Sequence, residues 1–165
     1  MNIAGLLHAL DELSGIHEQL IGLAEEKQQL IVHNEVDRLM AATAKESKHI
    51  AEIERVNRDV QQFTRACWSE IGIVPNERTT LADLLAAIVQ EDCKRPLHDA
   101  ANRLRDAVGR LKQINDRNQQ LVRQTLEYIN FQVDLLSAPL DDGTYAPTPK
   151  PAASGTARRM FDTRA

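Results

Sequence analysis

Apolar residues recur at helical spacing along most of the chain, and the pattern is longest between Cys93 and Ala138. After Pro96 this stretch contains no further proline and a single glycine. Two rows repeat every seven positions: Leu97, Leu104, Leu111, Asn118 and Thr125, and then Ala101, Val108, Asn115, Val122, Ile129 and Leu136. Such spacing is typical of a coiled-coil seam. The pattern predicts a helix of about forty residues, roughly 60 Å long, which needs partner helices.

The N-terminal half predicts two more long helices. The first covers Asn2 to about Val32 and carries a broad apolar stripe, and the second runs to about Ser69. Between them the periodicity resets at Asn34, which is expected to cap the second helix, with Asp37 three residues later near the positive helix end. A short break of this kind favours an antiparallel hairpin. One continuous helix through Asn34 is the alternative.

A loop and a short helix follow. The stretch from Ile71 to Thr80 breaks the helical pattern with a glycine, a proline and an asparagine. Thr80 can cap a short helix beginning at Leu81, with Asp83 as the acidic half of the cap. The residues expected on the apolar side of this helix and beneath it are Leu81, Leu84, Leu85, Ile88, Trp68 and Ile71. Pro96 is expected in the first turn of the long helix, where a missing N–H does no harm.

The composition changes from Pro139 onward, where four of the six prolines lie among small and polar residues. Too little apolar surface remains there to offset the entropy of ordering, so residues 139–165 are predicted to be a disordered tail after a helical domain of residues 1–138. Tyr145, Met160 and Phe161 resemble short recognition elements in that tail. The expected fold is all-α: an elongated antiparallel helical bundle or coiled coil, with two long helices, one short helix and one very long C-terminal helix.

Charge and composition exclude several classes of protein. The net charge of −4 and pI near 5.7 argue against a nucleic-acid binder, which needs a clustered basic face. No apolar run approaches the length needed to cross a bilayer, and the N-terminus lacks the basic region of a signal peptide. We therefore expect a cytoplasmic protein. Cys67 and Cys93 lack the spacing of a metal site and are expected to be reduced thiols.

Signatures of catalysis are absent, and the sequence suggests no cofactor and no metal. The five histidines are scattered, and His17, near the apolar stripe of the first helix, is expected to be a packed or edge residue. A histidine phosphotransfer domain is the enzymatic alternative. That class would place a lysine and a glycine just after the histidine, and none of the five has them.

Two asparagines in the seam admit two interpretations. Asn115 and Asn118 either fix the register of packed helices or serve as polar contacts for a partner, and the pattern alone does not decide between these. Beyond them the apolar surface spreads around more than one face of the helix. A three-helix body does not need so wide a stripe. The excess implies dimerisation or a groove that accepts an amphipathic helix from another protein.

Four features in order resemble the FlgN-type flagellar export chaperones. They are the N-terminal hairpin with its break at 33–37, the loop and short helix over 72–85, the Asn-x-x-Asn segment at Asn115 and Asn118 leading into Leu121-Val122 and Tyr128-Ile129, and the polar tail with Tyr145. Together they cover nearly the whole chain. Each is weak alone, because coiled coils resemble one another, and it is their combination that is specific.

The resemblance implies a cytoplasmic chaperone that binds the C-terminal amphipathic helical segment of flagellar hook-associated proteins. It would prevent their premature assembly and deliver them to the type III export gate. By position, the partner-binding residues would be Ile114, Asn115, Asn118, Leu121, Val122, Leu126, Ile129 and Val133, and Tyr145 would dock at the export gate. The competing hypothesis is a structural or adaptor coiled coil that forms a homodimer through the same surface.

Overall fold

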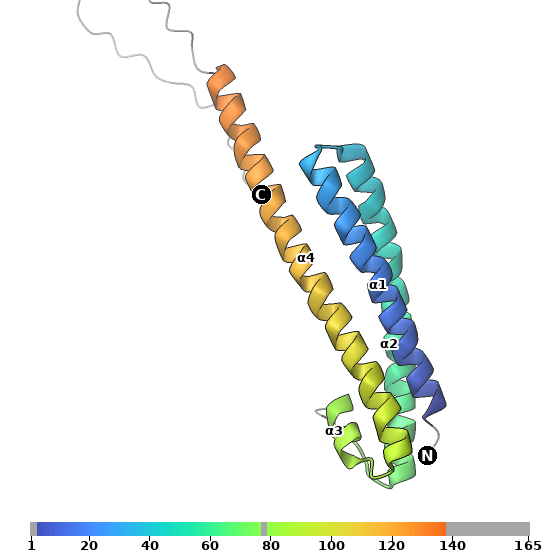
Figure 1. The fold of residues 1–165 in the computed structure, drawn as a ribbon. Helices are drawn as coiled ribbons and strands as arrows, with labels where there is room; N and C mark the ends of the chain where they lie inside the picture. The colour runs from blue at the N-terminus through green and yellow to red at the C-terminus, as the bar shows by residue number, and fades with distance from the viewer. Residues whose placement is uncertain (1–2, 77–78, 138–165) are drawn as a thin grey trace, which may run out of the picture.

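The computed structural model describes residues 3–76 and 79–137. It contains four helices and, within those ranges, no strand (Figure 1). The helices are α1 (Ala4–Val32), α2 (Val36–Ile71), α3 (Leu81–Ala87) and α4 (Glu91–Ser137). The all-α bundle predicted from the sequence is confirmed, and each helix begins and ends within about two residues of its expected position. None of the helices in the described ranges combines the length and apolarity that a membrane crossing requires. The predicted disorder of the tail concerns residues outside those ranges.

Helix α1 lies between α2 and α4 and packs against both. By contrast, no described Cα atom of α2 comes within 8 Å of one in α4. Ten side chains of α1 are buried, compared with four in each of its long neighbours. The broad apolar stripe of α1 therefore serves two interfaces at once. Each outer helix buries the side that faces α1 and, at one end of the bundle, residues that contact α3.

The chain runs up, down and up again, so that α1 and α4 are parallel and α2 is antiparallel to both. Arg103 lies 2.6 Å from Asp11, and seven residues later Arg110 lies 3.1 Å from Glu18. The two residues of each ion pair are the same number of positions apart in the sequence. This constant spacing fixes the direction and register of α4 along α1. These ion pairs are largely exposed and contribute little stability. The antiparallel α1–α2 hairpin is confirmed, and the alternative of one continuous helix is wrong.

Helix α3 closes one end of the bundle, which we call the base. It packs against both α2 and α4. One apolar cluster there joins all four helices: Leu6, Leu10, Cys67, Trp68, Leu84, Leu85, Ile88, Leu97 and Ala100. The predicted capping box is confirmed, since the Asp83 N–H donates to Thr80 Oγ1 at 3.3 Å and the Thr80 N–H donates to the Asp83 carboxylate at 2.8 Å. The Asp83 carboxylate also accepts a hydrogen bond from the Thr80 hydroxyl at 2.7 Å, and the two bonds that it accepts, from the Thr80 N–H and hydroxyl, lower the pKa of Asp83.

The turn between α1 and α2 corrects the role predicted for Asn34. Its side chain does not cap α2, whose N-cap position is Glu35. Instead Asn34 adopts a left-handed φ of 56° and ends α1. Its N–H donates to the carbonyl of Ile31 at 3.1 Å, and the Glu35 N–H donates to that of Leu30 at 2.9 Å. This pair of bonds is a Schellman motif, and asparagine tolerates the left-handed position better than most residues.

The position predicted for Pro96 is also wrong. Helix α4 begins at Glu91, so the proline falls in the second turn rather than the first. Its missing N–H removes the helical hydrogen bond to the carbonyl of Asp92. Because Asp92 is exposed, water can satisfy that carbonyl. The helix therefore continues through the proline.

We expect Leu97→Ala to destabilise the protein by about 2–5 kcal/mol, because Leu97 is fully buried in the base cluster. Urea unfolding followed by circular dichroism measures the change. Leu135→Ala is the matched control, since Leu135 is 61% exposed on the same helix and its truncation should cost less than about 0.5 kcal/mol. Equal losses in the two variants would contradict the placement of the core.

Asn34→Ala should cost about 1 kcal/mol or more, because alanine is strained in the left-handed conformation that ends α1. Asn34→Gly should retain the wild-type stability within a few tenths of a kcal/mol. The comparison by thermal unfolding tests the corrected role of this residue. A glycine variant as unstable as the alanine variant would contradict it.

Candidate functional site

An open groove lies between α2 and α4 at the end of the bundle opposite α3. The end of α1 forms its floor. It contains two adjoining hollows of about 530 Å³ and about 170 Å³. We call this feature the tip groove and define it by its lining residues: Lys27, Leu30, Ile31, Asn34, Glu35, Val36, Leu39, Thr43, Glu46, Asn115, Asn118, Gln119, Val122, Arg123, Thr125, Leu126 and Ile129.

The groove exists because the outer helices meet α1 and not each other. At the base, the side chains of α3 fill the space between α2 and α4. No described element occupies the corresponding space at the tip. Beyond the α1–α2 turn, the last turns of α4 extend past the hairpin (Figure 1).

The two heptad rows of α4 have different environments. The first row faces α1, with Leu97 and Asn118 buried and Leu104, Leu111 and Thr125 half-buried. The second row is more open: Val108 is 44% exposed, Val122 and Ile129 are each 38% exposed, and Leu136 is 87% exposed. The first row therefore packs mainly against α1, and at the tip residues of both rows line the groove.

Asn118 contacts its own chain. It is the one buried polar residue in the described part of the protein, and its Nδ2 donates to the backbone carbonyl of Ala24 at 2.7 Å. Its Oδ1 is buried and accepts no hydrogen bond from the described residues. Burial of a polar side chain costs free energy unless it finds a hydrogen-bond partner, and Asn118 finds this partner only in one register. The bond to Ala24 therefore fixes the register of α4 against α1. Asn115, one turn earlier, is half-buried and lines the larger hollow.

Five of the eight sequence-predicted partner-binding residues line the tip groove: Asn115, Asn118, Val122, Leu126 and Ile129. Val133 continues the same face and is 53% exposed. Ile114 and Leu121 are half-buried and line neither hollow. Tyr145 lies outside the described residues.

The opposite wall was missed by the sequence reasoning. It comes from the turn after α1 and the start of α2, where Val36, which is 56% exposed, lines the groove together with Leu39 and Thr43. The ion pair between Lys27 and Glu46 joins these helices, with Nζ 2.7 Å from the carboxylate and both side chains mostly covered. The available signal was the pair of apolar residues at the start of α2, Val36 and Leu39.

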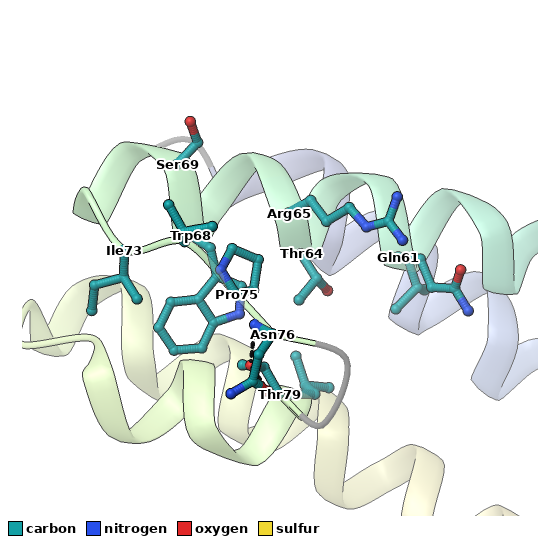
Figure 2. Close-up of a pocket in the computed structure, with 12 residues that line it drawn as sticks. Gln61, Thr64, Arg65, Trp68, Ser69, Ile73, Pro75, Asn76 and Thr79 are labelled. Atoms are coloured by element: carbon teal, nitrogen blue, oxygen red, sulfur yellow. Dashed lines mark hydrogen bonds between the residues drawn. The ribbon is translucent and has the colours of Figure 1, made fainter.

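The largest hollow, about 840 Å³, lies instead at the base between α2 and the loop that leads into α3. Figure 2 shows Gln61, Thr64 and Arg65 projecting from α2, with Pro75, Asn76 and Thr79 on the loop. Asn76 and Thr79 bond to each other at 2.9 Å. Histidine is absent from its lining, and no group of described His, Cys, Asp or Glu side chains is arranged to hold a metal ion.

A part-apolar groove between two helices is the kind of surface that can accept an amphipathic helix. Comparison with known proteins identifies the family of the chain. The family model described as FlgN protein matches residues 1–152, and the chain belongs to the FlgN family of flagellar export chaperones. An uncharacterized protein of Bacillus subtilis (strain 168), YvyG, is 26% identical over 166 residues and covers the full length of both chains. No solved structure matches the chain significantly.

Asn118→Asp should destabilise the protein by about 3 kcal/mol or more. The variant loses the donor to the Ala24 carbonyl and buries an unpaired carboxylate beside it. Asn115→Asp is the matched control, because that side chain is half-buried beside open space and should change stability by less than about 1 kcal/mol. Chemical unfolding at neutral pH gives both values. If Asn115→Asp proved the more damaging change, the assigned register role of Asn118 would be wrong.

Proposed function

We propose that this protein is a cytoplasmic chaperone for flagellar hook-associated proteins. It binds their C-terminal amphipathic helical segment in the tip groove, prevents premature assembly and delivers them to the flagellar type III export gate. Membership of the FlgN family supports the general role. The observation that carries the specific proposal is the groove itself, which is open between α2 and α4 and bordered by exposed apolar side chains.

Helix α3 shows what kind of partner suits the space. At the base, this short amphipathic helix buries Leu84, Leu85 and Ile88 in the cluster that α1, α2 and α4 share. A client helix at the tip would place apolar residues three and four positions apart against Val122, Leu126 and Ile129. Burial of each Leu- or Ile-sized side chain contributes about 1.5–3 kcal/mol to such binding. Client residues further along would contact Val133.

The polar residues of the groove have a separate role in the proposal. Asn115, at the edge of the larger hollow, is available for a client's polar side chain or backbone. Asn118 contributes indirectly by holding α4 on α1. In the tail, Tyr145 docks at the export gate, as the resemblance implies. A tail separate from the groove would allow docking while the client stays bound.

A second function is favoured by the same exposed stripe. A structural or adaptor coiled coil could cover Leu126, Val133 and Leu136 in a homodimer, since these side chains are 54%, 53% and 87% exposed.

The two functions differ in the stoichiometry of the complexes that the protein forms. Light scattering of the full chain, alone and mixed with a hook-associated protein, should give a one-to-one complex that is lost when the client's C-terminal segment is deleted. An obligate homodimer that forms no complex at micromolar concentration would favour the second function.

Val122→Asp should weaken client binding by about 100-fold or more, because an unpaired carboxylate would be buried under the client helix. The fold should survive, since Val122 is 38% exposed in the free protein. Phe131→Asp is the matched control, because Phe131 is 60% exposed on the opposite side of α4. Titration calorimetry with the client segment measures both. Equal affinities of Val122→Asp and wild type would place the client elsewhere.

A further inference from the structure

The tip groove lies beside the point where the described chain ends. Helix α4 ends at Ser137, on the same helix that provides one wall of the groove. A further 28 residues, 138–165, follow in the sequence. The groove is therefore within reach of the protein's own C-terminal segment.

We propose that, without a client, the segment Arg158–Phe161 of the same chain occupies the tip groove, with Met160 and Phe161 in its apolar part. The tail would then regulate the groove by competing with the client. Competition with a client requires that the proposed function is correct. Docking of the segment in the groove does not require it. The family match ends at residue 152, so the segment lies outside the matched region.

Chain length suits this occupant. Val122 lies about 22 Å back along α4 from Ser137, at about 1.5 Å per residue. Met160 is 23 residues beyond Ser137 in the sequence. A fully flexible coil of that length spans about 25 Å on average, and the four prolines of this segment extend it further, so Met160 can reach Val122. The effective concentration of a tethered group is highest when the mean span of its linker matches the distance to the site.

Tail residues that lie closer to Ser137 suit the tip groove less well. Leu140 is three residues beyond Ser137 and reaches at most about 10 Å even when fully extended. Ile129 lies about 12 Å back along α4, so Leu140 cannot reach even the near end of the groove. Tyr145 is eight residues beyond Ser137, and a coil of that length spans about 15 Å, so it reaches Leu126 and Ile129 at the smaller hollow. Val122 and the larger hollow lie about 22 Å or more back along α4, which Tyr145 reaches only with an extended connection. Met160 and Phe161 are two adjacent large apolar residues of the tail that reach the whole groove.

Charge also favours the C-terminal segment. Residues 156–165 carry three arginines and one aspartate. The hairpin tip, residues 25–46, carries more acidic than basic side chains: Glu25, Glu26, Glu35, Asp37 and Glu46 against Lys27, Arg38 and Lys45. Arg158 and Arg159 directly precede the apolar pair. The charged residues that line the groove balance, with Glu35 and Glu46 against Lys27 and Arg123, so the attraction for the two arginines would come from the net acidic charge of the hairpin tip as a whole.

The base of the protein provides the precedent within the same chain. There α3, a segment of only seven residues, covers the space between α2 and α4 with two leucines and the following isoleucine. The tip has the same three-helix framework and no covering segment among the described residues. The short apolar segment 158–161 could cover the tip groove in the same way that α3 covers the base.

Photo-crosslinking of the full chain without client tests the proposal. Phe161 is replaced by benzoyl-phenylalanine, which keeps an aromatic ring, and the matched control carries the same probe at Ala153. We expect probe 161 to form crosslinks within one chain, concentrated on residues 30–46 and 118–133, at several times the yield of probe 153. Equal yields from the two probes, crosslinks mainly between copies, or crosslinks mainly to residues 60–90 at the base would each overturn it.

A competition measurement separates this proposal from the function of the groove. Met160→Ser with Phe161→Ser should bind the client segment about 3- to 10-fold more tightly than wild type, because the competitor is removed. Ala152→Ser with Ala153→Ser should leave the affinity unchanged. An unchanged affinity in the first variant would contradict competition. Absence of client binding in wild type and both variants would count against the proposed function, while the crosslinks still decide docking.

Discussion

The structure depends on one packing constraint: α2 and α4 both contact α1, and their backbones do not contact each other. This arrangement places most of the buried side chains on α1, which is apolar on two sides. It also leaves a space between the two outer helices. At the base the chain fills that space with α3, and at the tip it leaves the space open. Stability and the candidate binding site therefore arise from the same geometry.

Register makes that geometry specific. Apolar seams tolerate sliding by a heptad, and a shift of α4 would bring different residues to the groove. The Asn118 amide bonded to the Ala24 carbonyl resists such a shift, because any other register would bury the amide without that acceptor. The exposed ion pairs from Arg103 and Arg110 each join residues 92 positions apart, close to the 94 positions between Asn118 and Ala24, so all three contacts belong to one register. A polar bond of modest net energy thus determines which side chains a partner meets.

The sequence predicted the helices well, because periodicity, the capping box at Thr80 and the interruption after Val32 are local signals. It misassigned Asn34, since an asparagine at a helix junction suits both the end of one helix and the start of the next. It could not divide the two heptad rows of α4 into a buried and an open one, because that depends on where α2 lies. For the same reason Val36 and Leu39, on the far wall, were not recognised as groove residues.

The central claim is that a client helix lies in the tip groove between both walls. Hydrogen–deuterium exchange of the full chain, with and without the C-terminal segment of a hook-associated protein, tests it most directly. Binding there should slow exchange in residues 30–46 and 115–133 together, and leave residues 64–88 at the base unchanged. Slower exchange confined to the base, or on α4 with none at the hairpin tip, would contradict the account.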